Sequence, residues 1–343
     1  MNNYRSNKLD DIWLTVVLIH VIGSALVSFL LGIPYGLMIF DSIIWIYLAY
    51  VNRKKKAAIF LCALGWSVCL YLFQNMPISY LVAFLINVML LSYLILLHYG
   101  DFLFLVEESG IKRPKGKELI SILPLTILLL ILAGYVNAIS MLFFKNHITE
   151  ALSNVQNQLA YAIIALALAP AVVEEIIFRG LIFHRLGNGR KAILISAMLF
   201  ALGHMNYNQI CYAFVMGLFF ALVFRITSNL TVTILIHFLF NLFTVITTAF
   251  RETSLVRVIL EFQIGGYCPF DGNLINESGT ILTSAVLSGA IIMIVATILI
   301  AAILRFVIKA NDLKEEEGIE KGNPGLGFYL GILACLFIAF LMK

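Results

Sequence analysis

The chain has 343 residues, of which 62% are hydrophobic and 12% are charged, and its mean hydropathy is +0.99. A composition this apolar and this poor in charge lies outside the range of water-soluble domains and indicates an integral membrane protein. The net charge of +4 requires no nucleic-acid partner, because no stretch interleaves basic and aromatic residues as a nucleic-acid surface does.

Apolar runs recur along the chain, and a helix needs roughly 20 such residues to cross the ~30 Å hydrocarbon core. Several runs are shorter, and any of these could be re-entrant or fused with a neighbour. The sequence therefore predicts an all-α, polytopic helical bundle with about 8–11 transmembrane helices. The eleven candidate runs are 12–32, 36–51, 57–73, 77–98, 119–144, 159–183, 191–207, 209–225, 229–249, 281–306 and 327–342.

The basic residues favour one orientation of this bundle. With a cytoplasmic N-terminus and all eleven runs crossing, 19 of the 23 Lys and Arg residues lie on the cytoplasmic side, as the positive-inside rule requires. Abundant Ile, Lys and Asn favour a bacterial source, and hence the bacterial cytoplasmic membrane. Composition divides the chain into N-terminal helices (1–150), a middle block with polar residues inside its runs (151–250), and a loop with C-terminal helices (251–343).

The stretch PAVVEEIIFRG (170–180) places three ionisable residues inside an apolar run, where each such group costs about 2.5–3.5 kcal/mol at a helix centre. Glu175 and Arg179 are four residues apart and share a helical face, so we expect them to form an ion pair. Glu174 lies about 100° further around the helix, so we expect it to point elsewhere and to be free for chemistry.

Two later runs carry further polar residues. Phe200 and His204 (FALGH), and His237 and Asn241 (HFLFN), are four residues apart within each pair and so share a face. At ~1.5 Å per helical residue, Glu174, His204 and Asn241 lie about 18–19 Å from the cytoplasmic helix ends, and His237 about 12 Å. The sequence therefore predicts that these four polar side chains meet in one layer of the bundle.

A carboxylate, two histidines and an amide in a water-accessible pocket suffice for peptide hydrolysis. A Glu or His accepts a proton from water, a His returns it to the leaving amine, and His or Asn donors hold the oxyanion. Glu174, His204 and His237 could instead bind Zn²⁺ and leave one position for water. A third interpretation is structural, because polar residues also join transmembrane helices.

The ordered set Glu174-Glu175 with Arg179, Phe200 with His204, and His237 with Asn241 resembles the CAAX protease and bacteriocin-processing (CPBP) family, which contains the type II CAAX prenyl endopeptidases. The resemblance covers roughly 159–249, with gaps of 25 residues from Arg179 to His204 and 33 from His204 to His237. It implies a multi-helix bundle whose conical cavity opens to the cytosol.

The same resemblance assigns roles to the motif residues. Glu174 and His204 would activate the attacking water, and His237 and Asn241 would stabilise the oxyanion. Glu175 and Arg179, with Phe200 in the second motif, would be supporting residues. The family has been described both as glutamate proteases and as metalloproteases, so zinc stays open as a cofactor.

The function expected from this set is an intramembrane endopeptidase. Its substrate would be a membrane-associated or lipidated peptide or protein, cleaved near the cytoplasmic half of the membrane, with lipid as the surrounding partner. The alternatives are a non-catalytic binding or regulatory membrane protein, with an immunity or scaffold role, and a carrier that uses the same polar layer. A carrier usually shows paired repeats, and none is visible in the sequence. The sequence sets no oligomeric state.

Overall fold

The structure is a computed structural model and describes residues 80, 84, 87, 110–144, 155–183, 186–187, 189–204, 206–272, 274–275 and 280–310. Every named element in these residues is helical, which confirms the all-α prediction. Five helices are long and apolar enough to cross a membrane, so the chain is a polytopic integral membrane protein. The predicted runs 12–32, 36–51, 57–73 and 327–342, and nearly all of 77–98, lie outside the described residues.

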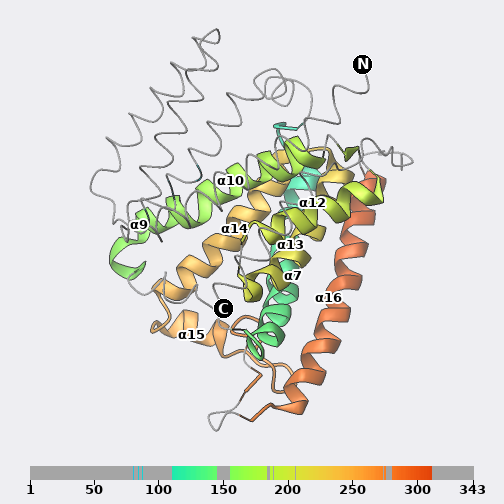
Figure 1. Cartoon of the computed structure of the whole chain (residues 1–343). Coiled ribbons are helices and arrows are strands. Elements are labelled where there is room, and N and C mark those ends of the chain that lie inside the picture. Colours follow the sequence, from blue (N-terminus) through green and yellow to red (C-terminus); the bar gives the residue numbers. More distant parts are fainter. Residues whose placement is uncertain are drawn as a thin grey trace, which may run out of the picture.

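The five spans agree with the predicted runs to within a few residues. They are α7 (Gly116–Met141), the segment Val155–Phe183, α13 (Tyr207–Thr227), α14 (Leu230–Ala249) and α16 (Thr283–Ala310). The run 191–207 is instead the short helix α12 (Arg190–Leu202), which has 13 residues and forms a hairpin with α13. A further short helix, α15 (Ser254–Leu260), lies between α14 and α16 (Figure 1).

Hydrogen bonds join α7 and α14 at the end of the bundle where both helices begin. The amide of Asn229 donates to Glu118 over 3.1 Å, and the same carboxylate accepts the backbone N–H of Lys115 at the start of α7. The backbone N–H of Leu230 donates to the carbonyl of Gly110. The helix α13 ends at Thr227, only two residues before Asn229, so it reaches the same end of the bundle.

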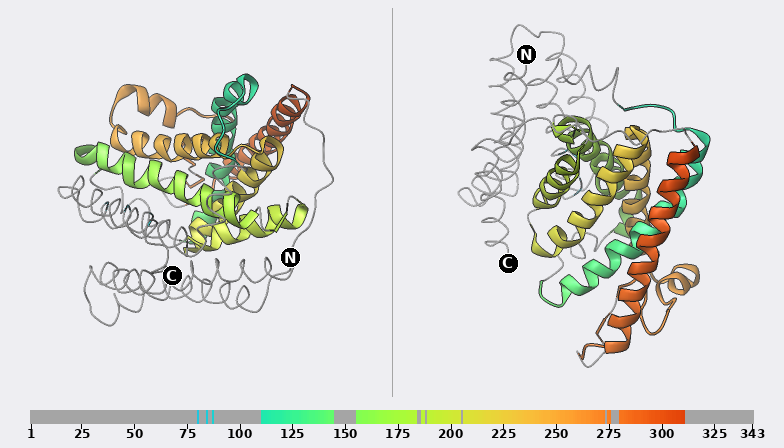
Figure 2. Two further views of the ribbon diagram at one scale, coloured as in Figure 1. Left: turned by 90° about the horizontal axis from the view of Figure 1, so that it is seen from above. Right: turned by 90° about the vertical axis from the view of Figure 1, so that its right-hand side faces the viewer.

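The segment between α14 and α16 packs against α7 and α16 at the other end of the bundle. Tyr267 is fully buried and meets the ring of Tyr135 edge to face, while the Tyr135 hydroxyl donates to Val286 of α16. A Cβ added to Gly134 would lie 3.1 Å from the carbonyl oxygen of Pro269, so this segment packs tightly on α7. Two views of the ribbon show α7 and α16 side by side (Figures 1 and 2).

The span Val155–Phe183 changes its helical geometry along its length. Its consecutive parts are η3 (Val155–Gln158), α9 (Leu159–Ala162), η4 (Ile163–Leu168), α10 (Ala169–Glu175) and η5 (Ile176–Phe183), of which η4 and η5 are π-helical. Pro170 stands at the start of α10 and has no N–H to continue the ladder before it. π-helical turns are rare and are often found at functional sites, and here one begins directly after the two glutamates.

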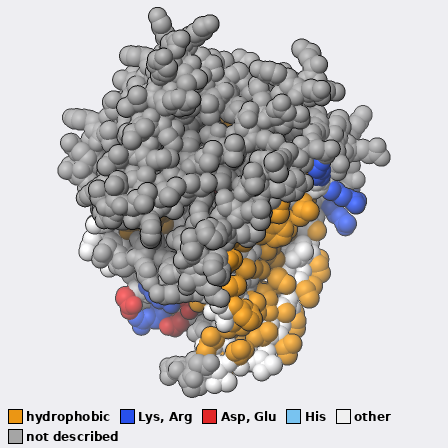
Figure 3. Space-filling view, viewed as in Figure 1, with side chains coloured by type: hydrophobic (Ala, Val, Ile, Leu, Met, Phe, Trp, Pro, Cys, Tyr) orange, Lys and Arg blue, Asp and Glu red, His pale blue; other side chains and the backbone are white. Residues whose placement is uncertain are grey.

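The outer surface of α16 is apolar, as a surface facing lipid must be. Leu287, Ile291 and Ile298 are each 62% exposed although they are large and hydrophobic. In the space-filling view, hydrophobic side chains cover the described surface between basic side chains at the upper right and mixed charges at the lower left (Figure 3).

Candidate active site

A fully buried ion pair lies at the centre of the bundle. Nη1 of Arg179 donates to Oε1 of Glu175 over 2.9 Å, and neither side chain is exposed. This confirms the pair predicted from the four-residue spacing. The guanidinium also donates through Nη2 to the carbonyl oxygen of Gly217 over 3.1 Å. It lies between two aromatic rings, 4.6 Å from the centroid of Phe200 and 5.0 Å from that of Phe220, which adds cation–π attraction to the ion pair.

The same carboxylate oxygen holds His237. Nδ1 of His237 lies 3.1 Å from Oε1 of Glu175. Because Arg179 already donates to this oxygen, the oxygen is an acceptor, and the proton of this hydrogen bond belongs to Nδ1. Nε2 of His237 then points the other way and lies 3.8 Å from Oε2 of Glu174.

The expectation that adjacent glutamates point to different places is therefore only partly right. Glu174 and Glu175 leave the helix in different directions, but each reaches a different nitrogen of the same imidazole. Glu175 is fully buried, whereas the Glu174 side chain keeps 24% of its surface exposed. One carboxylate is thus enclosed in the packed core and the other faces open space.

His204 lies beside His237 and is held in a similar way. Its Nδ1 is 2.9 Å from the carbonyl oxygen of Phe200, one turn earlier, so this nitrogen carries the proton and Nε2 is left free. The Phe200 ring contacts both imidazoles, with centroids 5.0 Å from His204 and 5.8 Å from His237. Phe220 stacks on the other side of His237 at 4.9 Å. Two aromatic rings therefore fix how the histidines are placed.

A cavity of ≈540 Å³ opens beside these groups, and Glu174, His204, His237 and Asn241 all line it. The prediction that these four residues share one layer is thus consistent with the structure. Glu175, Arg179 and Phe200 do not line the cavity and stand behind its wall.

The cavity is also lined by polar side chains that the sequence analysis did not single out. Asn137 of α7 and Gln209 and Tyr212 of α13 are among them. Asn137 has no polar partner four residues away in its apolar run, so the spacing that selected Asn241 did not mark it. Phe220 and Gly217, which contact Arg179, lie in an apolar helix where nothing in their spacing marks them.

The arrangement meets some of the conditions of a zinc site. Histidines that bind a metal usually donate their other ring N–H to a carboxylate or a backbone carbonyl, as His237 does to Glu175 and His204 to Phe200. However, within the described part of the chain no three His, Cys, Asp or Glu side chains are close enough together to hold a metal ion. As positioned, Glu174, His204 and His237 do not form a zinc site.

The fold and this cavity define a polytopic membrane protein with a buried carboxylate–histidine centre. Residues 156–243 match the family described as Rce1-like, type II CAAX prenyl endopeptidase Rce1-like. This confirms the resemblance seen in the motifs for the segment that contains all of them.

One curated relative is similar over part of its length. Over 107 residues the chain is 34% identical to the membrane-embedded CAAX protease MroQ of Staphylococcus aureus (strain USA300). The similarity spans 29% of this chain and 43% of that relative, so it covers less than half of either protein. No solved structure matches the chain.

Proposed function

We propose that this chain is an intramembrane endopeptidase that hydrolyses a peptide bond in a membrane-associated or lipidated peptide or protein. The observation that carries the proposal is the pair of Glu174 Oε2 and His237 Nε2, which face each other 3.8 Å apart on the cavity wall. This distance is too long for a direct hydrogen bond. A carboxylate in such a position, partly open to the cavity, is placed to accept a proton from an attacking water.

The proposed reaction has two steps. The oxygen of a water attacks the scissile carbonyl carbon while Glu174 takes its proton, and the electrons of the carbonyl double bond move to oxygen. Nε2–H of His237 and the amide of Asn241 donate to this oxyanion. When the intermediate collapses, the C–N bond breaks and the proton on Glu174 passes to the leaving amine. His204 presents its free Nε2 to the cavity and orients the water.

The donor role of His237 needs both ring nitrogens protonated. Nδ1–H is already given to Glu175, so donation from Nε2 requires the imidazolium form. The buried group of Arg179, Glu175, His237 and Glu174 then carries no net charge. A neutral set of paired charges is far less costly to bury than one with an unbalanced charge.

Isosteric glutamine variants of the full chain test this proposal. The purified protein in lipid nanodiscs would be incubated with lipidated and leader-type peptides, and the products would be read by mass spectrometry. We expect Glu174→Gln to abolish cleavage, since an amide cannot accept the proton. Glu252→Gln makes the same chemical change at an exposed position outside the cavity and should leave cleavage unchanged.

Two results would contradict the proposal. Equal cleavage by wild type and Glu174→Gln would remove Glu174 from the reaction. Binding of these peptides without cleavage by the wild type would favour the non-catalytic binding protein.

A further inference from the structure

The cavity occupies one half of the bundle. Its lining includes residues 130–137 in α7, 209–216 in α13 and 237–248 in α14. The first and third ranges lie mostly in the later half of their helices, and the second lies in the earlier half of its helix. Because α7 and α14 begin and α13 ends at the same end of the bundle, all three ranges run from the middle toward the opposite end.

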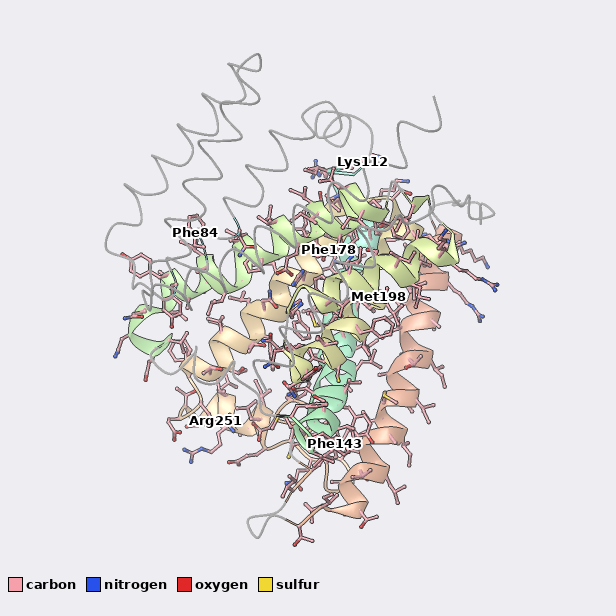
Figure 4. All side chains as sticks on the ribbon, in the orientation of Figure 1. Phe84, Lys112, Phe143, Phe178, Met198 and Arg251 are labelled. Atoms are coloured by element: carbon pink, nitrogen blue, oxygen red, sulfur yellow. The ribbon has the colours of Figure 1, made fainter. Side chains whose placement is uncertain are left out.

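The end of the bundle that is remote from the cavity carries most of the basic residues. Labelled side chains show the two ends, with Lys112 at the top and Arg251 and Phe143 at the bottom (Figure 4). The described basic residues of the upper end are Lys112, Arg113, Lys115, Lys117, Arg190, Lys191, Arg225, Arg305 and Lys309. Within the described residues, the lower end has Arg251 and Arg257, accompanied by Glu252, Glu261 and Asp271.

In the described residues, buried apolar side chains fill the half of the bundle nearer the basic end. Between Leu230 and His237, α14 covers about 10 Å at ~1.5 Å per residue. Phe183 and Phe224 meet edge to face at this level, with ring centroids 5.5 Å apart. Together with Arg179 between its aromatic rings, these buried side chains lie between the basic end and Glu174 and leave no open path through the described helices.

We infer that the catalytic cavity is entered from the face opposite the basic residues, which the positive-inside rule makes the extracytoplasmic face. This differs from the cytosolic opening that the family resemblance implies. The mouth lies beside Arg251, Leu260 and Asp271, in the charged segment that follows α14. Charged residues mark the edge of the hydrocarbon core, so the cavity leads from the membrane surface down to Glu174.

If the chain is the proposed endopeptidase, the cavity also limits the length and charge of the peptide segment that it can hold. Along α14 it extends about 16 Å from His237 to the mouth, which about five residues of an extended peptide span at ~3.3 Å each. Arg251 and Asp271 at the mouth form an ion pair of 2.7 Å. Apart from these two residues and Glu174, no described residue that lines the cavity is an Arg, Lys, Asp or Glu. The substrate is therefore an extended, uncharged peptide segment presented at the extracytoplasmic surface.

Cysteine labelling in bacterial cells tests the direction of entry without any need for turnover. The five native cysteines would be replaced, and single cysteines introduced as Thr248→Cys in the cavity, Glu252→Cys on the charged segment and Lys117→Cys at the basic end. Intact and permeabilised cells would be treated with a membrane-impermeant maleimide. We expect Thr248→Cys and Glu252→Cys to react in intact cells and Lys117→Cys to react only after permeabilisation.

Either of two labelling patterns would overturn the inference. Reaction of Thr248→Cys and Glu252→Cys only after permeabilisation would place the mouth on the cytoplasmic side. Reaction of Glu252→Cys alone, with Thr248→Cys silent in both preparations, would show that the cavity has no opening there. Labelling as expected in a protein that cleaves nothing would leave the direction of entry intact and refute only the proposed hydrolysis.

Discussion

Replacing Glu175 and Arg179 singly and then together distinguishes two effects of the buried ion pair, its effect on the stability of the fold and its effect on the orientation of His237. In Arg179→Met the Glu175 carboxylate keeps His237 as a partner, but the group of four charges loses one of its two positive members, and the Gly217 carbonyl loses its donor. Breaking one side of a buried pair typically costs about 3–5 kcal/mol. This is a large part of the roughly 5–15 kcal/mol by which folded proteins are stable. Glu175→Leu should cost a similar amount, because it strands the guanidinium.

The double variant Glu175→Leu/Arg179→Met should recover most of the lost stability. Two apolar side chains of similar volume leave no charge unpaired, and such replacements are often neutral or stabilising. Activity should not recover, because Nδ1 of His237 has lost its acceptor and Nε2 is no longer held toward Glu174. We expect kcat to fall about 10–100-fold, as when a residue that orients a metal-bound histidine is removed.

Thermal unfolding of the four proteins in detergent, combined into a double-mutant cycle, measures the coupling between the two side chains. Peptide cleavage at a temperature where all four are folded measures the effect on the site. A double variant as unstable as either single variant would refute the role assigned to the pair. A stable double variant with normal kcat would show that Glu175 does not orient His237.

Three further predictions concern packing, the oxyanion and metal. A Cβ on Gly217 would lie 2.8 Å from Cα of Ala197. Gly217→Ala should therefore lower the free energy of unfolding by about 1–3 kcal/mol, measured as a lower melting temperature. Gly116→Ala, where the added Cβ meets open space, should leave the melting temperature unchanged. Asn241→Ala should lower kcat about 10²–10³-fold with KM little changed, and Asn157→Ala on the exposed surface should be neutral. A chelator should leave the initial rate unchanged; a loss that added Zn²⁺ restores would instead support a zinc mechanism.

The sequence predicted what depends on spacing along one helix. Four-residue spacing predicted the pair of Glu175 and Arg179, because neighbouring turns of a helix bring such side chains together whatever surrounds them. The length of the hydrophobic runs predicted the five described spans, because the length that a span needs is set by the thickness of the membrane and not by contacts with other helices. The run 191–207 was assigned less well, because a hairpin inside a protein can use a helix shorter than the bilayer.

The contacts between helices were beyond the reach of this reasoning. Helix geometry places Glu174 and Glu175 about 100° apart. This angle prevents both carboxylates from reaching one distant atom, but it allows both to reach an imidazole ring that lies between them. His237 offers two nitrogens on opposite sides, so two diverging carboxylates reach the same residue. The aromatic rings around Arg179 come from α12 and α13, and nothing in the sequence of either helix records that approach.

The packed half of the bundle and the cavity beside Glu174 depend on the same contacts. Arg179 holds Glu175, Glu175 holds Nδ1 of His237, and His237 then turns Nε2 toward Glu174 at the head of the cavity. Phe220 takes part in both, because it packs against the guanidinium on the closed side and stacks on His237 beside the cavity. Among the described helices, an entrance from the basic end would have to pass through these groups. In this fold, entry from the opposite face is therefore the arrangement that leaves the orientation of His237 undisturbed.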